Sequence, residues 1–422
     1  MSHVVIDTEA ERAGARSGER AVDLARAWSH GNRALAELGL TAHLTPVPPG
    51  DPGAWRCVLR RDGEPVVGGD GSGKGASPAA RVGALFEALE HHLSRDLPAD
   101  GVRVLGAHEA ADGLAGDAAF AVLAAGPDRP LACLPYRDLL DGSERALPVF
   151  LSAPDHLRRD RAAQRAALGD TYDYSAARRY SLNSGWAAGT TPVEAAVHAI
   201  NEIIERDAMS LLLVERFLVR RPAPLRVTRP DTLPDDLAAL HRRAEDLLGQ
   251  PVHLVDMTTD LGVPAYWAHT AAPAGRPARV RGCGASLSAR YAAERALTEL
   301  VQIHSIATHE ADPRAGRVPR TTAHPALHRC YLADLTAPGR VRPVAFADTD
   351  APATPQDHLD ALLRLLDRAG YRAWAWQRHV TDHLAVLNTC VPGMERFMLV
   401  TDGALVLPGR RGLDHRAAAA SS

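Results

Sequence analysis

The sequence predicts an α+β fold, because strand-like and helix-like segments occur along it without the regular alternation that is typical of a parallel α/β sheet. The chain has 422 residues, 46% of them hydrophobic, and can therefore bury a large core. Length alone allows two or three ordinary domains or one unusually large domain. The proline-rich segments 222–234, 273–277 and 313–325 are too short to be clear domain linkers.

Hydrophobic periodicity locates the individual elements. Strands are expected at 253–257, 264–268, 371–376 and 384–388. Helices are expected at 21–40, 237–248 and 356–368, in addition to three helices described below. The first residues are polar, and we expect residues 1–18 and 411–422 to be flexible tails.

Composition excludes several classes of partner and site. A net charge of −3 gives no positive field to hold a nucleic acid backbone. The N-terminus lacks the order of a signal peptide and no apolar stretch is long enough to cross a membrane, so we expect a cytoplasmic protein without a membrane partner. The five cysteines are scattered and form no C-x-x-C pair, which argues against disulfides and a structural zinc site.

Lys74 is the only lysine among the 48 Lys and Arg residues, and it lies in the glycine-rich segment 71–75. A compact ammonium group between glycines suits contact with a phosphate or a carboxylate that a planar guanidinium would not fit. The segment is not a P-loop, because the G-x-x-x-x-G-K-[ST] spacing is absent. Any phosphate contact of Lys74 therefore needs a different framework.

A similar pattern occurs three times along the chain. Each copy has a glycine turn, a Ser or Thr cap region, and then a helix with two acidic or amide side chains three residues apart. The three pairs are Glu87 and Glu90, Glu202 and Glu205, and Glu299 and Gln302. Because residues three apart lie on one side of a helix, each helix presents its pair as a group.

Each pair lies beside an apolar stripe. In the second helix the stripe consists of Val193, Val197, Ile200 and Ile204. The polar face of the same helix carries Glu194, His198, Glu202 and Glu205. The helices can therefore be buried on one side while their acidic groups gather along the flank.

Clustered carboxylates need a compensating cation, because like charges on one helix repel by roughly a few tenths of a kcal/mol per pair. Mg²⁺ takes carboxylate, water and phosphate oxygens, so a nucleoside triphosphate would complete its shell. Arg206 and Lys74 would then neutralise phosphate oxygens. The alternative is that the pairs lie on solvated helix faces. Zinc fits less well, because the adjacent His91 and His92 point apart on a helix and no H-E-x-x-H spacing is present.

The residues around these pairs resemble the YcaO family. The segment 73–90 looks like the first signature of that family, and 184–207 looks like the central one. The segment 295–302 resembles a third signature, and 391–395 a later turn. Together these segments extend over most of the chain, roughly from residue 71 to residue 395.

The resemblance implies a single large α+β domain at 19–410 that binds ATP and Mg²⁺ without a P-loop. It implies that the metal is held by Glu87, Glu90, Glu194, Glu202 and Glu205. The implied cofactor-binding residues further include Lys74, Thr190, Arg206, Arg295 and Gln302. Because Gln302 makes the third pair only half acidic, we expect the first two helices to hold most of the metal.

Similar proteins use ATP to activate a backbone amide of a ribosomally made precursor peptide. A nucleophile adds to the amide carbonyl, the oxyanion takes the γ-phosphoryl group, and phosphate then leaves. A neighbouring Cys, Ser or Thr gives an azoline, external sulfide a thioamide, and an internal amine an amidine. We therefore expect a precursor peptide as substrate and a partner protein that delivers substrate or sulfur. Pairing with a second copy of the chain is a further expectation.

Several positions depart from the family pattern. Gly83, His91, Thr190 and His304 stand where Ser, Arg, Asn and Arg are usual. Thr190 still offers an oxygen, whereas the two histidines reduce the fixed positive charge at neutral pH. The segment 405–422 lacks the Pro-x-Pro-x-Pro ending of azoline-forming members, which keeps thioamide and amidine formation open. The main alternative is a noncatalytic relative that binds nucleotide or precursor peptide as a scaffold.

Overall fold

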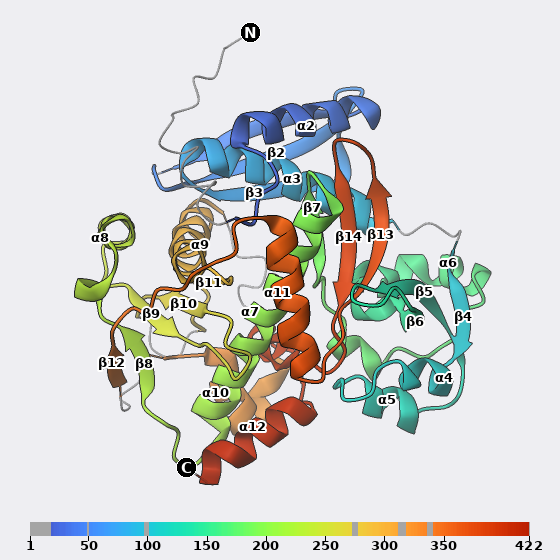
Figure 1. The fold of residues 1–422 in the computed structure, drawn as a ribbon. Helices are drawn as coiled ribbons and strands as arrows, with labels where there is room; N and C mark the ends of the chain where they lie inside the picture. Colours follow the sequence, from blue (N-terminus) through green and yellow to red (C-terminus); the bar gives the residue numbers. More distant parts are fainter. Residues whose placement is uncertain are drawn as a thin grey trace.

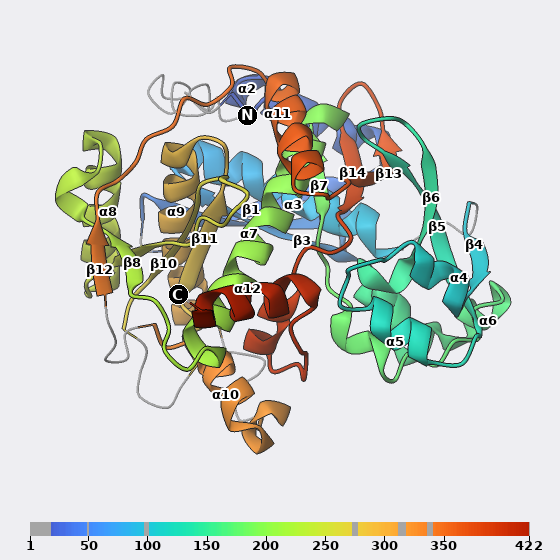
Figure 2. The ribbon, with the colours of Figure 1, turned by 60° about the horizontal axis from the view of Figure 1, so that its bottom comes forward.

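In the described part of the chain, three β-sheets surround the long helix α7 (Pro192–Leu218), which crosses the middle of the molecule in Figure 1 and Figure 2. The structure is a computed structural model and describes residues 18–48, 50–96, 101–271, 277–310, 318–335 and 341–421. The expected α+β fold is confirmed. The tail expected at 1–18 lies outside the described residues, apart from Gly18.

The first sheet is an antiparallel meander at the top of Figure 1. Its strands, in spatial order, are β1 (Thr41–Val47), β2 (Gly53–Arg61) and β3 (Glu64–Gly75). Helix α3 (Ser77–Arg95) packs on β2 and β3, and α2 (Leu24–Glu37) packs on α3. Buried leucines of the two helices, among them Leu35 and Leu89, join Leu59 of β2 in one apolar cluster.

The second sheet has five strands and lies on the opposite side of α7 from the third. In spatial order they are β11 (Arg281–Ala285), β10 (Ala265–His269), β9 (His253–Asp256), β8 (Leu225–Thr228) and β12 (Val341–Val344). Among the described strands of this sheet, β8 and β12 pair in parallel and the other neighbours pair antiparallel. Helix α9 (Ala289–His309) packs on β10 and β11, and α8 (Asp235–Leu248) packs on α9.

The third sheet has six strands. Five follow one path, β4 (Arg103–Gly106), β5 (Pro130–Asp138), β13 (Trp374–Val380), β14 (Ala385–Cys390) and β7 (Trp186–Gly189), and β6 (Glu144–Pro148) pairs with β5. The short helices of this part are α4 (Ala107–Asp112), α5 (Phe120–Ala125) and α6 (Ala162–Ala167). Helices α10 (Pro325–Leu332) and α11 (Pro355–Arg368) pack on α7.

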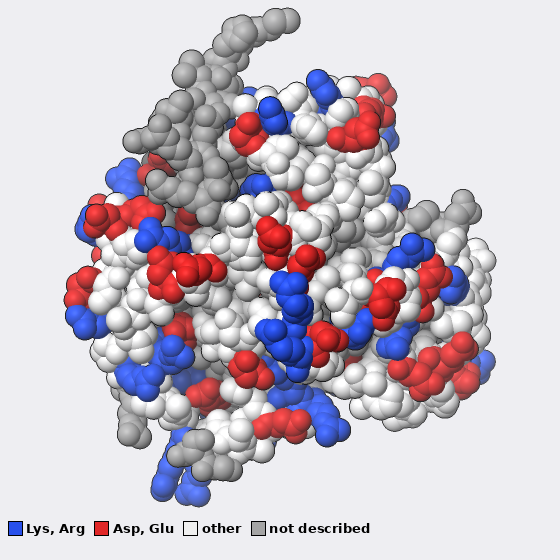
Figure 3. All heavy atoms as spheres, in the orientation of Figure 1, with Lys and Arg blue, Asp and Glu red and all other residues white. Residues whose placement is uncertain are grey.

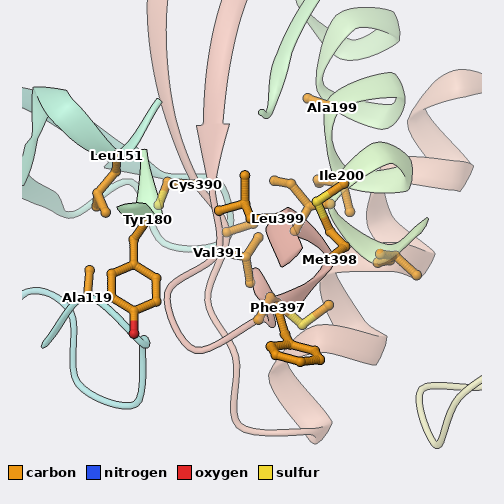
Figure 4. Close-up of a cluster of buried hydrophobic side chains, with 14 of the residues drawn as sticks. Ala119, Leu151, Tyr180, Ala199, Ile200, Cys390, Val391, Phe397, Met398 and Leu399 are labelled. Carbon is orange, nitrogen blue, oxygen red and sulfur yellow. The ribbon is translucent and has the colours of Figure 1, made fainter. Parts of the chain in front are cut away.

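Helix α7 begins at a well-formed N-terminus and carries the expected apolar stripe. The Thr191 side chain accepts a hydrogen bond from the Glu194 backbone N–H (3.2 Å), and Pro192 occupies the first turn. Val197, Ile200 and Ile204 recur at helical spacing and are buried. Figure 4 shows the adjoining core, where α7 meets the segment after β14.

Most of the expected elements are found. The strands expected at 253–257, 264–268 and 384–388 are β9, β10 and β14, and the helices at 237–248 and 356–368 are α8 and α11. The helix at 21–40 is the shorter α2. The strand expected from residue 371 starts only at Trp374, because the Tyr371 backbone N–H closes the end of α11 by donating to the Leu366 carbonyl (2.8 Å).

The end of the chain differs from the expectation. The sequence predicts a flexible tail at 411–422, but residues Arg410–Ser421 form helix α12, which packs on α7. Arg411 accounts for much of this packing, because its guanidinium lies 2.9 Å from the buried carboxylate of Asp207 and 2.6 Å from that of Asp260. An alanine-rich composition also favours the helix.

The cysteines and the charged surface residues agree with the expectations drawn from the composition. All five cysteines are buried free thiols. Within the described segments, no helix combines the length and the apolar character needed to cross a bilayer. Acidic and basic side chains are interspersed over the face drawn in Figure 3.

Glu395 is a buried carboxylate beneath the first turn of α12. Its Oε1 accepts a hydrogen bond from the Gly412 backbone N–H (2.9 Å), and its own backbone N–H donates to Asp207. Burial raises the pKa of Glu395 to about 7, and the negative charge of Asp207 adds to this effect. The fold therefore favours the protonated form of this side chain.

We predict that Glu395→Gln removes part of the pH dependence of stability. Because the pKa is raised in the folded state, the stabilisation is fully present below the unfolded pKa and is lost as the pH rises through about 7. Between about pH 5 and about pH 8 the wild type should lose up to about 3 kcal/mol more stability than the variant. Urea unfolding at both pH values measures this difference, with the exposed Glu64→Gln as control. Equal losses in the wild type and in Glu395→Gln would contradict the prediction.

Candidate functional site

Two strand–helix units of similar construction meet at the site. In one, β3 leads into α3, and in the other, β11 leads into α9. A Cβ atom added to Gly73 would lie 1.6 Å from the backbone oxygen of Ala80, and one added to Gly284 would lie 2.2 Å from that of Ala292. Glycine is therefore required for strand backbone and helix backbone to touch.

The two units correspond position by position. Glu87 lies seven residues after Ala80, and Glu299 lies seven residues after Ala292. Glu90 and Gln302 likewise occupy matching positions on their helices. The same close contact therefore fixes how near each helix lies to its strand. The two helices differ in that α9 carries the amide Gln302 where α3 carries the carboxylate Glu90.

Glu87 lies where α3 approaches β3 and α9. Its Oε2 accepts a hydrogen bond from the Ser72 backbone N–H (2.6 Å), and its Oε1 lies 3.8 Å from Nε2 of His91. Burial raises the pKa of Glu87, the Glu299 carboxylate adds to the increase, and His91 and Lys74 oppose it. The carboxylates of α3 and α9 therefore interact directly through their charges.

Glu90 and Glu202 connect α3 to α7. The Ala188 backbone N–H donates to Oε2 of Glu90 (3.2 Å), and the Gly185 backbone N–H donates to Oε1 of Glu202 (3.0 Å). Burial raises the pKa of Glu90 well above its usual value, and the negative charge of Glu202 contributes further. Both carboxylates are therefore held by the β7 segment and destabilise each other electrostatically.

Glu205 joins the group one helical turn after Glu202. Burial raises the pKa of Glu205 to about 7, and the Glu299 carboxylate adds to this increase. Lys74 forms an ion pair with Oε2 of Glu299 and so connects β3 to α9. We refer to Glu87, Glu90, Glu202, Glu205 and Glu299 as the carboxylate cluster.

Among the described residues, four cations border the carboxylate cluster. Besides Lys74 these are Arg206, whose Nη1 donates to the Asn183 carbonyl (2.8 Å) and lies 3.4 Å from Oε1 of Glu202, Arg295, whose charge acts on Glu205, and Arg281, whose charge acts on Glu299. With all five carboxylates ionised, negative charge exceeds the charge of these cations. The raised pKa values of Glu87, Glu90 and Glu205 agree with this excess, and a bound cation would relieve it.

Glu194 lies in a neighbouring group at the N-terminus of α7. Nη1 of Arg20 donates to Oε1 of Glu194 (3.1 Å), and the Thr190 hydroxyl donates to Oε2 (2.6 Å). Arg20 also donates to the hydroxyl of Tyr291 on α9 (3.3 Å). Glu194 is thus already paired with a cation of this chain.

The structure brings together most of the expected site residues. Those in or beside the carboxylate cluster are Lys74, Glu87, Glu90, Glu202, Glu205, Arg206 and Arg295. Thr190 and Glu194 instead form a separate group with Arg20 at the N-terminus of α7. Gln302 is buried on α9, one turn beyond Glu299.

Three residues were missing from the expected site. Glu299 belongs to the third pair. Its position on α9 matches that of Glu87 on α3, and this correspondence in the sequence could have added Glu299 to the expected site. Arg20 lies just after the expected tail and belongs to no recognised motif, so nothing in the sequence pointed to it. His198 lies between the two groups, where burial and the charges of Arg295 and Arg20 lower its pKa well below the usual value. It is therefore neutral under ordinary conditions.

The departures from the family pattern have local explanations. Nδ1 of His91 lies 2.6 Å from the Asp70 carbonyl, so this ring is held against β3. Burial lowers the pKa of His304, which keeps it uncharged at neutral pH. A Cβ atom at Gly83 would lie 3.5 Å from the Cα of Gly73, an ordinary contact, so a serine also fits there.

A protein family whose model is described as YcaO cyclodehydratase, ATP- and Mg²⁺-binding, matches residues 72–395, which is more than half of the chain. The chain belongs to the YcaO family. The expectation drawn from the sequence signatures is thus confirmed, and it includes ATP and Mg²⁺ as the cofactors.

Solved structures of low identity share this fold. The YcaO protein of Methanopyrus kandleri bound with AMPPCP and Mg²⁺ is 18% identical, with a TM-score of 0.63 over 97% of this chain and 99% of that one. A heterocyclase in complex with substrate and cofactor is 17% identical, with a TM-score of 0.61 over 89% of this chain and 52% of that one. The Escherichia coli microcin synthetase McbBCD complex with bound pro-MccB17 is 12% identical, with a TM-score of 0.54 over 84% of this chain and 88% of that one.

One curated relative is similar in sequence. It is an uncharacterised protein from the tfuA 3′ region of Rhizobium leguminosarum bv. trifolii, 29% identical over 245 residues. The alignment covers 54% of this chain. The chain matches about half of the relative's length, 53%.

The residues of the site suit a magnesium–nucleotide complex. Mg²⁺ commonly uses one or two carboxylates and completes its shell with water and phosphate oxygens. Across the part of the chain that the structure describes, no three His, Cys, Asp or Glu side chains are grouped so that they could hold a metal ion by themselves, so phosphate and water oxygens would have to complete the shell. The carboxylate cluster offers the oxygen donors, and Lys74 and Arg206 lie beside it to bind phosphate.

We predict opposite effects of Glu90→Gln on the free and the ligand-bound protein. Removing one of the mutually repelling carboxylates should stabilise the ligand-free protein, by about 1 kcal/mol near pH 8. The same change should reduce the thermal stabilisation that Mg²⁺ and AMPPCP provide, because a charged carboxylate ligand becomes a neutral amide, which binds Mg²⁺ more weakly. Thermal unfolding with and without ligand measures both effects.

The exposed Glu109→Gln on α4 is the control for the loss of one charge. It should change neither the stability of the ligand-free protein nor the stabilisation by Mg²⁺ and AMPPCP. A Glu90→Gln protein that is less stable without ligand would contradict electrostatic crowding at this position. An undiminished ligand effect would remove Glu90 from the site.

Proposed function

We propose that this chain is an enzyme that uses ATP to phosphorylate a backbone amide of a ribosomally made precursor peptide. The observation that carries the proposal is the convergence of glutamates from α3, α7 and α9 beside Lys74 and Arg206. Membership of a family described as ATP- and Mg²⁺-binding cyclodehydratases supports it. The same arrangement is hard to explain for a fold that binds no cation, because the carboxylates destabilise one another.

We assign the residues according to their positions. Glu87, Glu90, Glu202 and Glu205 hold Mg²⁺, which neutralises phosphate charge when bound. Lys74 pairs with Glu299 of α9 and Arg206 lies 3.4 Å from Glu202 of α7, and both bind phosphate oxygens. Glu194 takes part in metal binding once Arg20 releases its carboxylate. Arg295, Thr190 and Gln302 line the nucleotide site.

The reaction transfers oxygen from the amide to phosphate. A nucleophile forms a bond to the carbonyl carbon, and the carbonyl electron pair moves to oxygen, which takes the γ-phosphoryl group as ADP leaves. The carbon–oxygen bond then breaks, phosphate departs with the electron pair, and the remaining proton is lost. The product is an azoline, a thioamide or an amidine, according to the nucleophile.

A partner protein is part of this proposal. One relative is named for its position beside tfuA, and one structural neighbour is a complex named McbBCD. These names support a search among the products of genes adjacent to the gene of this chain. A second copy of this chain remains a further candidate.

We predict that phosphate release depends on the precursor peptide and is abolished by Glu202→Gln. Purified protein, the products of neighbouring genes and the encoded precursor peptide are combined with ATP and Mg²⁺. Peptide mass distinguishes the loss of water, which indicates an azoline or amidine, from the replacement of oxygen by sulfur, which indicates a thioamide. The exposed Glu109→Gln serves as the control and should retain turnover.

A noncatalytic scaffold is the alternative. It is favoured by the Arg20–Glu194 ion pair, which occupies one of the expected metal-binding carboxylates. Under the same conditions the scaffold predicts nucleotide binding without phosphate release. That outcome would contradict the proposed enzyme.

A further inference from the structure

A series of hydrogen bonds leads from the interior of the third sheet to Glu202 of the carboxylate cluster. The Tyr136 hydroxyl on β5 donates to Oδ1 of Asn388 on β14 (2.7 Å), and Nδ2 of Asn388 donates to the Ser184 carbonyl (3.0 Å). The Gly185 backbone N–H then donates to Oε1 of Glu202 on α7 (3.0 Å). Figure 1 shows β14 beside β7, the strand that directly follows the Ser184 segment. Three elements that are distant in the sequence thus meet at one glutamate.

A single peptide group joins Asn388 to Glu202. The Ser184 carbonyl and the Gly185 N–H belong to the same trans peptide, which is planar, so the two groups point in opposite directions. Fixing the carbonyl on Asn388 therefore fixes the direction in which the N–H is presented to Glu202. The carbonyl can only accept, so the Asn388 amide turns its NH₂ group toward Ser184 and its oxygen toward Tyr136. The two partners thus determine the orientation of this amide.

Burial and close contact keep this arrangement rigid. Asn388 is fully buried and Tyr136 is 2% exposed. Burial also raises the pKa of Tyr136, so its hydroxyl remains a hydrogen-bond donor. Gly185 has a φ of +73°, and a Cβ atom there would lie 1.9 Å from the Thr389 carbonyl oxygen. Because the Thr389 N–H also donates to the Gly185 carbonyl (2.7 Å), the segment is held directly against β14.

The three hydrogen bonds all run in one direction, from the hydroxyl to the carboxylate. In such a series each bond polarises the next, which strengthens the last bond. That bond ends on Glu202, and hydrogen bonds to a charged group are stronger than those between neutral groups. The carbonyl of the preceding residue, Asn183, accepts from Nη1 of Arg206 (2.8 Å). The same short segment therefore holds one anion and one cation of the proposed magnesium–nucleotide site.

We propose that Asn388 is a positioning residue of this site, which orients Glu202 through the Ser184–Gly185 peptide and is itself oriented by Tyr136. The inference rests on the proposed function, because it takes Glu202 as a carboxylate that holds magnesium. A carboxylate that is already held in one direction loses less conformational freedom when a metal ion binds. Groups that hold a metal-binding side chain in this way contribute to metal affinity without touching the metal.

Manganese binding to the full chain in the presence of AMPPCP, followed by electron paramagnetic resonance, tests this role. Asn388→Ala should weaken Mn²⁺ binding by roughly tenfold, the usual effect of removing a group that orients a metal-binding side chain. Tyr136→Phe should weaken it by roughly threefold, because it removes one neutral hydrogen bond at the start of the series. If circular dichroism shows that Asn388→Ala does not fold, Tyr136→Phe decides the outcome.

Tyr174→Phe is the matched control for Tyr136→Phe. Tyr174 is also buried, and its hydroxyl donates to Oδ2 of Asp170 (2.8 Å), away from the carboxylate cluster. Both substitutions remove a buried hydrogen bond and should lower the melting temperature. Only Tyr136→Phe should weaken manganese binding. Equal manganese affinities in the two variants would assign Tyr136 a structural role alone and would overturn its part in the proposal.

A double substitution shows whether Asn388 acts through Glu202. Glu202→Asp keeps a carboxylate in the cluster, but its side chain is one methylene too short to reach the Gly185 N–H. In this background Asn388→Ala should change manganese affinity by less than about twofold, because the link between the two residues is already broken. A full tenfold loss in this background would show that Asn388 acts by another route and would overturn the proposal.

The remaining outcomes separate this proposal from the proposed function. If the wild type binds Mn²⁺ with AMPPCP and Asn388→Ala binds it equally well, the positioning role is wrong and the proposed function stands. If the wild type itself binds no Mn²⁺ with AMPPCP, the proposed magnesium site fails together with the positioning role. If manganese binding follows the prediction but no precursor peptide triggers phosphate release, the proposed enzyme fails and the positioning role stands.

Discussion

Electrostatic repulsion among the glutamates of α3, α7 and α9 is balanced by close packing of the strands beneath two of those helices. The Gly73 and Gly284 contacts fix α3 and α9 at backbone distance from β3 and β11. Because these contacts admit no side chain, neither helix can move inward or rotate freely to separate the charges. The fold therefore maintains an arrangement that is unfavourable until cations enter it.

The cations of the chain are arranged around this constraint. Lys74 ties β3 to α9 through Glu299, and Arg206 ties the α7 glutamates to the segment before β7. Arg20 neutralises Glu194 at the other end of α7 and thereby separates this carboxylate from the cluster.

The local parts of this site could be predicted from the sequence. The paired glutamates and their apolar stripes depend only on helical periodicity, and Lys74 stood out as the single lysine. The pairing of Lys74 with Glu299 could not be predicted, because it joins segments far apart in the chain. Helix α12 was missed for the same reason, since its ion pair is with Asp207 of α7.

Manganese binding measured by electron paramagnetic resonance tests the central claim most directly, because Mn²⁺ takes the same oxygen ligands as Mg²⁺. The account predicts that the protein binds Mn²⁺ tightly only when AMPPCP is present. Glu87→Gln on α3 and Glu205→Gln on α7 should each weaken this binding by at least about tenfold, as expected for the loss of a carboxylate ligand. Manganese binding that is indifferent to AMPPCP, or that survives either substitution unchanged, would contradict a single magnesium–nucleotide site shared by the two helices.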